Sequence, residues 1–305
     1  MKRFLVLVPW LAAAQSFHVA PQWPSFTKEL PRLEQVTGVA VDAKNRVFVA
    51  HRHKKMPIVV FDGATGKFLY SFGADFLPNP HGLSVDAQGN LWIPDIETHQ
   101  VNKVSPEGKV LMTLGERGKP GNDATHFDRP TQAAVAPNGD IYVSDGYGNF
   151  RVAQFTAQGK FIRAWGQKGS GPSEFEIPHA VAIDRQGLLY ISDRGNSRVQ
   201  IFDARGKYLR EWKNLAALGR PWALAFAPNG NIFLVDGGDA AHGGATRSRV
   251  IHLDAAGKVL GEFGRAGFQP GEFDWAHDLA VGPDGAVYVG DVHDGKRIQK
   301  FTAKK

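Results

Sequence analysis

The feature that most constrains the fold is a short phrase that recurs six times along the chain. Each copy starts at an anchor residue and runs into small and apolar residues, as in His81-Gly82-Leu83-Ser84-Val85 and Trp222-Ala223-Leu224-Ala225-Phe226. The six anchors are Thr37, His81, Thr131, His179, Trp222 and His277. Their mean spacing is about 48 residues, and a repeat of that length is typical of a propeller or a solenoid.

Within each repeat the residues favour four short β-strands. The anchor phrase is followed by a turn such as Pro137-Asn138-Gly139-Asp140, and Asn-Gly between apolar runs is a strong hairpin signal. A second strand follows, as in Ile141-Tyr142-Val143, and the third and fourth resemble 198–202 and 207–212. No long helical pattern occurs beyond the first anchor, which argues against a helical solenoid. The repeats therefore predict an all-β fold, a six-bladed β-propeller with four antiparallel strands per blade.

The last repeat supplies only three strands before the chain reaches Lys305. A propeller must close its ring, because an open ring exposes unpaired strand edges. We therefore expect residues 15–36 to act as a closing strand and linker before a propeller at 37–305. In particular, the segment 17–23 is expected to pair beside 297–302.

The first 14 residues have the pattern of a secretory signal peptide. Lys2 and Arg3 precede an apolar run that ends in three alanines, and this run is too short for stable membrane insertion. We therefore expect a secreted or periplasmic protein. The net charge is +6, but no run of five or six basic residues occurs, which argues against a nucleic-acid partner. The chain has no cysteine and so no disulfide, and we expect a monomer.

Three of the six anchors are histidines, and they occupy alternate repeats. His81, His179 and His277 are each separated by 98 residues, so a closed ring would bring them together at its axis. Neutral imidazole is a common metal ligand, and three protein ligands with a fourth position open are usual in catalytic zinc sites. A single histidine before a strand is more often structural, but three at one offset predict a zinc site.

The residue 14 positions after each anchor is expected to end the second strand. These residues are His51, Asp95, Asp145, Asp193, Asp236 and Asp291. A hairpin returns its second strand to the level at which the first began. The anchors, expected just before the innermost strands, should therefore share one mouth of the channel with the residues that follow these positions. The aspartates themselves are expected to hold loops through Asx turns.

Three side chains at that mouth suggest a reaction centre, namely Arg52, Tyr147 and Arg194. A cation near a tyrosine favours the phenolate and lowers its pKa, so Tyr147 could be a general base. The two guanidiniums are suited to a carboxylate on the substrate. The alternatives are that Tyr147 only fills the channel wall and that the arginines pair with aspartates of the loops.

At these residues the chain resembles a known family, the peptidyl-α-hydroxyglycine α-amidating lyases, which are related to NHL-repeat propellers. The resemblance covers 37–302 and is most specific at Pro80-His81-Gly82-Leu83, Ser144-Asp145-Gly146-Tyr147 and His277-Asp278. It implies a zinc-dependent carbon–nitrogen lyase that cleaves an α-hydroxyglycine-like peptide into an amide and glyoxylate. His81, His179 and His277 would then hold the zinc, and Tyr147 would be the base beside Arg52 and Arg194.

The resemblance also implies a structural calcium in the channel. Its ligands would be the backbone carbonyls of Val39 and Leu83 and the carboxylate of Asp278, and such oxygen ligands suit calcium. From the residues alone, Asp278 could instead support a zinc-bound histidine. Two other functions stay open: a non-catalytic secreted propeller that binds peptide or polymer and holds a structural metal, and, last, a metal-assisted hydrolase, for which the channel lacks a carboxylate-rich cluster.

Overall fold

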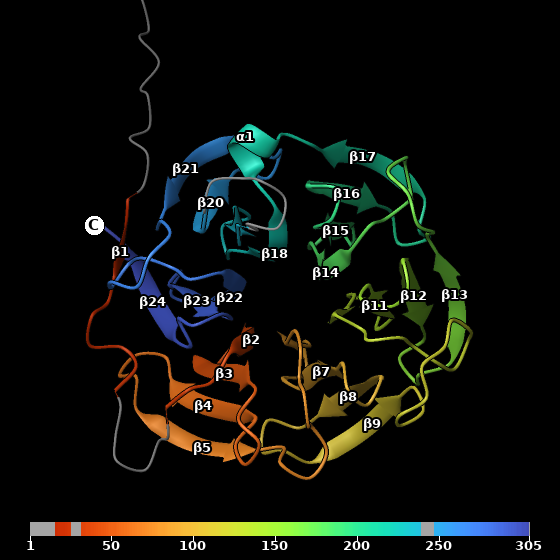
Figure 1. Ribbon diagram of the computed structural model, residues 1–305, viewed down its shortest axis with the longest axis horizontal. Coiled ribbons are helices and arrows are strands. Elements are labelled where there is room, and N and C mark those ends of the chain that lie inside the picture. The colour runs from red at the N-terminus through yellow and green to blue at the C-terminus, as the bar shows by residue number, and fades with distance from the viewer. Residues whose placement is uncertain (1–15, 26–31, 239–246, 305) are drawn as a thin grey trace, which may run out of the picture.

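The computed structural model describes residues 16–25, 32–238 and 247–304. Its strands form six four-stranded antiparallel sheets that stand like blades around a central axis (Figure 1). This confirms the all-β, six-bladed propeller that the repeats predict. The expected signal peptide at 1–14 lies outside the described residues.

In the first five blades, four consecutive strands run from the axis outward. Blade one comprises β2 (Val36–Val41), β3 (Arg46–His51), β4 (Ile58–Asp62) and β5 (Phe68–Phe72). Blade two comprises β6 (Ser84–Val85), β7 (Leu91–Asp95), β8 (Gln100–Val104) and β9 (Val110–Leu114). Blade three comprises β10 (Gln132–Val135), β11 (Ile141–Asp145), β12 (Arg151–Phe155) and β13 (Phe161–Trp165). Blade four comprises β14 (Pro178–Ile183), β15 (Leu189–Asp193), β16 (Arg198–Phe202) and β17 (Tyr208–Trp212). Blade five comprises β18 (Pro221–Phe226), β19 (Ile232–Asp236), β20 (Arg249–Leu253) and β21 (Val259–Phe263).

The sixth blade joins the two ends of the chain, as the incomplete last repeat predicts. It comprises β22 (Ala276–Val281), β23 (Val287–Asp291), β24 (Ile298–Ala303) and, outermost, β1 (Phe17–Val19). Strand β1 pairs antiparallel with β24, with His18 opposite Thr302 (Figure 1). The ring of Phe17 packs between blades, 5.2 Å from Phe233 and 4.9 Å from Phe263 between ring centroids. The N-terminal strand therefore closes the ring.

Apolar side chains fill the spaces between neighbouring blades. Between blades one and two, for example, Phe48 and Val60 pack with Leu83 and Ile93 in one buried cluster. Each blade is therefore stabilised mainly by its neighbours, as in other repeat folds. Among the described residues, the short α1 (Leu215–Leu218) is the one α-helix. No helix in this part of the chain is long and apolar enough to span a membrane.

The hairpins between first and second strands turn on glycine, as the Asn-Gly pattern predicts. Gly139 and Gly230 have φ values of 91° and 87°, a region that residues with a Cβ rarely adopt. These turns lie at the end of the propeller opposite the anchors, because each inner strand runs away from its anchor. The anchors therefore share one end of the channel.

Four of the six anchors, Thr37, His179, Trp222 and His277, lie at β-bulges, a detail that the sequence pattern did not predict. His179 and His277 are the second residues of β14 and β22, not residues just before a strand, and each falls at a shift in the strand register. His81 does precede β6, in the interval between the Pro80–Asp95 bridge and that strand. A bulge leaves one residue without a partner opposite it and can redirect its side chain. The bulges thus free the histidines to point toward the axis.

Candidate metal centre and reaction site

The three anchor histidines converge at the channel axis and are almost fully buried, with at most 2% of each exposed. Their ring centroids are 5.0 Å apart for His81 and His179, 4.7 Å for His81 and His277, and 4.8 Å for His179 and His277. One nitrogen from each ring lies within 4.8 Å of the other two. The geometry places the predicted ligands around a single point.

Backbone carbonyls of the intervening blades orient two of these rings. The Nδ1–H of His81 donates to the carbonyl of Thr131 at 2.8 Å, and that of His179 donates to the carbonyl of Trp222 at 2.7 Å. Because a carbonyl only accepts, Nδ1 carries the proton in both rings and Nε2 keeps its lone pair. Burial lowers the pKa of His81 to about 3 and the pKa values of His179 and His277 well below their usual value, so the rings are neutral.

The neutral Nε2 atoms fit a metal ion. The Tyr147 hydroxyl lies 3.1 Å from Nε2 of His81 and 3.1 Å from Nε2 of His179, but it has one proton and can donate to only one of them. The Nε2 lone pair of either His81 or His179 therefore receives no hydrogen bond from this phenol. A cation among the three rings would satisfy all of these lone pairs, and three imidazoles are a common ligand set for zinc.

Tyr147 links the histidines to the guanidinium of Arg194. An Nη1–H of Arg194 donates to the phenol oxygen at 3.4 Å, and the guanidinium lies 4.0 Å from the ring centroid of Trp222. Burial raises the pKa of the Tyr147 phenol, whereas the charges of Arg194 and Arg52 act in the opposite direction. The arginines were expected to lower the pKa of Tyr147 below its ordinary value. They oppose the effect of burial but do not exceed it, so the pKa of the phenol stays raised.

Arg52 reaches the same mouth from the end of β3. Its Nη1 donates to the side-chain oxygen of Gln35 at 2.6 Å, and its buried Nε has no hydrogen-bond partner among the described residues. A cavity of about 190 Å³ opens over the centre, and its walls include Arg52, Tyr147, Arg194 and His277. The residues expected to hold zinc or to take part in the reaction therefore line one pocket or lie directly beneath it.

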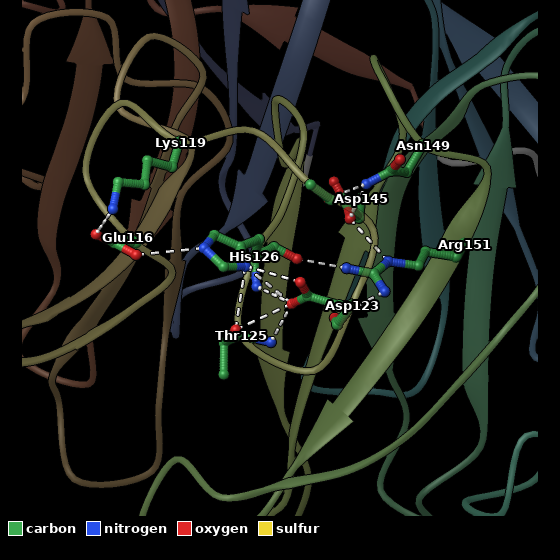
Figure 2. Close-up of polar contacts among 9 residues, drawn as sticks. Glu116, Lys119, Asp123, Thr125, His126, Asp145, Asn149 and Arg151 are labelled. Atoms are coloured by element: carbon green, nitrogen blue, oxygen red, sulfur yellow. Dashed lines mark hydrogen bonds and ion pairs between the residues drawn. The ribbon is translucent and has the colours of Figure 1, made fainter.

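The loop that carries Tyr147 is held by a buried ion pair at the end of β11. Figure 2 shows Asp145 facing Asn149 and Arg151, and the Arg151 Nε–H donates to this carboxylate at 2.9 Å. The other guanidinium nitrogens of Arg151 donate to the carbonyls of Asp123 and His126 in the preceding loop. At Gly146, a side chain would overlap the carbonyl oxygen of Pro178 in the next blade. These contacts set the backbone position of Tyr147.

The aspartates at equivalent positions hold the loops mainly through arginine, whereas Asx turns were expected. Only Asp95 acts chiefly as an Asx turn, because it accepts the backbone N–H groups of Glu97 and Thr98. The others each pair with an arginine that begins, or directly precedes, the third strand of the same blade. These pairs are Asp145–Arg151, Asp193–Arg198, Asp236–Arg249 and Asp291–Arg297.

The residues expected to bind calcium also meet inside the channel. The Asp278 carboxylate accepts the backbone N–H of Val39 at 3.0 Å and is also hydrogen-bonded by the backbone of Leu279 and Leu83. Burial raises the pKa of Asp278 to about 7. The contacts thus use N–H groups, whereas the expected ligands of Val39 and Leu83 are carbonyls.

Three residues of the pocket, Gln35, Trp222 and Trp275, had no functional role in the sequence prediction, and Trp222 stacks beneath the guanidinium of Arg194. His293, which was expected with His99 and His126 as a possible residue of the pocket rim, also lines the pocket. Trp222 and Thr131 are the non-histidine anchors whose carbonyls orient the rings of His179 and His81. The alternation of histidine with other anchors was a usable signal for this role. Gln35 comes from a segment without a repeat pattern and gave no such signal.

Comparison with known proteins is consistent with this arrangement. A family described as a 6-bladed β-propeller matches residues 127–292. Peptidyl-α-hydroxyglycine α-amidating lyase 2 of Drosophila melanogaster is 32% identical over 325 residues, covering 92% of this chain and 74% of the fly protein. Peptidyl-glycine α-amidating monooxygenase B of Xenopus laevis is 35% identical over 315 residues, covering 93% of this chain.

The match to the frog protein takes in 35% of its length, so the chain spans about a third of that monooxygenase. Among solved structures, a streptogramin B lyase aligns over 95% of this chain with a TM-score of 0.64 and 14% identity. At that identity the likeness shows the fold alone.

Proposed function

Because this chain belongs to the family of the peptidyl-α-hydroxyglycine α-amidating lyases, we propose that it is a metal-dependent carbon–nitrogen lyase acting on an α-hydroxyglycine. The names of its relatives support an enzyme connected with peptide amidation. The observation that carries the proposal is the meeting of three neutral histidines with one phenol, whose hydroxyl lies 3.1 Å from two of the Nε2 atoms. A tyrosine that only filled the channel wall would not need to lie against these nitrogen atoms, whereas a general base beside a metal centre would.

His81, His179 and His277 are the proposed ligands of a zinc ion. When bound, zinc would supply a positive charge that favours the ionised forms of a substrate hydroxyl and of the Tyr147 phenol. Without such a charge, burial keeps the pKa of Tyr147 above its ordinary value.

The reaction needs a proton to leave the α-hydroxyl and a proton to reach the leaving nitrogen. Tyr147, as phenolate, would accept the hydroxyl proton at its Oη atom. The carbon–oxygen bond then becomes a carbonyl while the bond from the same carbon to the amide nitrogen breaks. The Tyr147 phenol can return its proton to that nitrogen, so the products are a primary amide and glyoxylate and no other reactant is consumed.

Arg194 and Arg52 are proposed to hold the carboxylate of the hydroxyglycine. Both line the 190 Å³ pocket, and a guanidinium presents paired donors that match a carboxylate. The contact with Trp222 fixes the Arg194 guanidinium beside the Tyr147 oxygen. The same cation can therefore bind the substrate and favour the phenolate.

Two further expectations from the sequence, a calcium site and a location outside the cytoplasm, are part of this proposal. A calcium ion would be held by Asp278 together with the carbonyls of Val39 and Leu83, whose backbones already surround that carboxylate. The protein would act outside the cytoplasm, as a secreted or periplasmic enzyme, because its first 14 residues have the signal-peptide pattern.

A direct assay tests the proposed activity. The purified protein, supplied with zinc, is incubated with α-hydroxyhippurate, and benzamide and glyoxylate are measured together. We expect both products in a one-to-one ratio, at a rate far above that of the uncatalysed reaction. A zinc-loaded protein that releases neither would contradict the proposal and favour the non-catalytic propeller. Release of benzoate instead of benzamide would indicate a hydrolase.

A further inference from the structure

A second cavity adjoins the pocket over the histidines. Its volume is about 660 Å³, and it shares Gln35 and Arg52 with the 190 Å³ pocket. The smaller pocket is below the roughly 300–1,000 Å³ typical of ligand sites, so it has room for little beyond the hydroxyglycine end of a substrate. The acyl part must extend outward, and the shared wall at Arg52 leads into the larger cavity.

The lining of the larger cavity is strongly basic. Besides Arg52, it carries the ammonium groups of Lys54, Lys55 and Lys296, together with the imidazole of His53. Its one carboxylate, Glu34, is paired with Lys296 at 3.2 Å. Among the described residues, neither Lys54 nor Lys55 has an ion-pair or hydrogen-bond partner for its side chain. An anion entering this cavity would therefore meet several cations and no unpaired carboxylate.

A local turn and the closure of the ring bring these cations together. The backbone N–H of Met56 donates to the carbonyl of His53 at 3.2 Å, which fixes the turn that carries Lys54 and Lys55 after β3. Lys296 comes from the turn between β23 and β24, more than 200 residues away in sequence. The cavity thus lies where the first and last blades meet, beside one edge of the reaction site.

We propose that this cavity binds an anionic side chain of the substrate, namely a carboxylate on the residue that precedes the hydroxyglycine. The inference rests on the proposed lyase function and adds to it a preference for acyl-hydroxyglycines with an acidic side chain over neutral ones. Arg52 would face both anionic groups, the hydroxyglycine carboxylate on one side and the acidic side chain on the other. Lys54, Lys55 and Lys296 act on binding and not on the bond that breaks.

Two nearly isosteric substrates test the proposal, acetyl-Glu-α-hydroxyglycine and acetyl-Gln-α-hydroxyglycine. We expect kcat/KM to be about 5- to 10-fold higher for the Glu substrate at low ionic strength, since each exposed charge pair contributes a modest amount. The preference should nearly vanish in about 1 M salt, where the Debye length is about 3 Å. Equal kcat/KM values for the two substrates at low salt would overturn the inference.

A matched pair of charge-reversal variants tests where the preference arises. K54E/K55E should abolish or reverse the preference, because it should lower kcat/KM for the Glu substrate by a larger factor than kcat/KM for the Gln substrate. K207E/K258E changes the net charge equally, but its residues lie in outer hairpins at the opposite end of the propeller. The K207E/K258E variant should keep the preference for the Glu substrate. Loss of the preference in both variants would attribute it to overall charge and overturn the proposed cavity.

A binding measurement separates this inference from the proposed reaction. Acetyl-Glu-Gly and acetyl-Gln-Gly lack the hydroxyl group that the reaction requires, so their affinities can be compared by calorimetry without turnover. Tighter binding of the Glu peptide that depends on Lys54 and Lys55, with no glyoxylate from either substrate, would contradict the lyase but keep the anion site. Turnover of both substrates without any preference in rate or affinity would contradict the anion site alone.

Discussion

The single phenol of Tyr147 is the residue on which the chemistry depends most. It is shared between two imidazole lone pairs and receives a hydrogen bond from Arg194. If the histidines hold the proposed metal through Nε2, none of them can accept a proton at that atom. The phenol oxygen is therefore the base nearest to the proposed reacting hydroxyl.

Replacing Tyr147 by Phe should remove the base and retain the site. We expect kcat for glyoxylate release to fall by about 10²- to 10⁴-fold, the usual contribution of general-base catalysis. Zinc content and thermal unfolding should match those of wild type, because the three histidines are unchanged. Tyr208→Phe, in the outer strand β17, is the control and should retain full activity. Undiminished release from Tyr147→Phe would exclude the phenol as base.

His126 offers a separate test of the electrostatics in the loop before β10. Its Nδ1 lies 2.9 Å from Asp123 and its Nε2 lies 3.3 Å from Glu116. Figure 2 shows the ring between these two carboxylates, an arrangement that favours the imidazolium because both of its nitrogens are then donors. These hydrogen bonds raise the pKa of His126 above 6.5. The stabilisation is thus complete below the unfolded pKa and is lost as pH rises through the folded pKa.

An NMR titration of the His126 ring checks this prediction. The midpoint should lie above 6.5 in wild type and fall in Glu116→Gln, which removes one of the two acceptors of charge-assisted bonds. A midpoint at or below the ordinary value in wild type would show that the two carboxylates do not hold the ring as described.

At the scale of elements, the ends of the second strands are fixed by buried ion pairs with arginine. Arg198 is the most enclosed example, since 1% of its side chain is exposed and its partner Asp193 is fully buried. The same guanidinium donates to the carbonyls of Ser170, Gly171 and Glu174 in the loop before β14. One side chain therefore joins a blade to the loop that leads to His179.

Arg198→Ala should lower the free energy of unfolding by about 3–5 kcal/mol, because it leaves the Asp193 carboxylate buried without its partner. Chemical denaturation measures the change. Arg210→Ala, an exposed residue of β17, is the control and should change the same quantity by less than about 0.5 kcal/mol. If both variants lose equally little, the ion pair does not hold the blade in place.

For the whole molecule, stability depends on closing the ring. Strand β1 covers the outer edge of β24, and Phe17 packs against the aromatic rings of blade five. Removal of residues 1–19 would expose the edge of β24 and the apolar contact that Phe17 covers. We expect Tm to fall by more than about 5 °C and aggregation to increase. An unchanged Tm would mean that the first and last blades hold the ring without this strand.

The repeat allowed much of the molecule to be predicted from the sequence. Six anchors were sufficient for six blades, and the 98-residue spacing was sufficient to bring His81, His179 and His277 together. Tyr147 and the two arginines followed from the position at which a hairpin returns. These predictions depend on local patterns that recur at equal spacing. A closed ring places the equivalent positions of its repeats close together at the axis.

The other features of the site depend on contacts that the repeat pattern does not contain. Gln35 faces Arg52 across the hairpin of β2 and β3, but Lys296 meets this hairpin only because the ring closes between the first and last blades. The basic cavity therefore has no complete local signal. The direction of the pKa shift of Tyr147 depends on how completely the phenol is buried, which residue spacing does not give. Likewise, the bulges that turn His179 and His277 toward the axis arise from the strand register and not from the residue pattern.

The most direct test of the central claim is a zinc titration of the reaction itself. The protein is stripped with a chelator, zinc is added in steps, and glyoxylate release from α-hydroxyhippurate is measured at each step. Activity should rise from near zero and level off at about one zinc per chain, and His179→Ala should show no such rise, since two remaining histidines rarely hold zinc tightly. Full activity in the stripped protein, or the same titration curve in His179→Ala, would contradict the claim that the three histidines form the reaction centre.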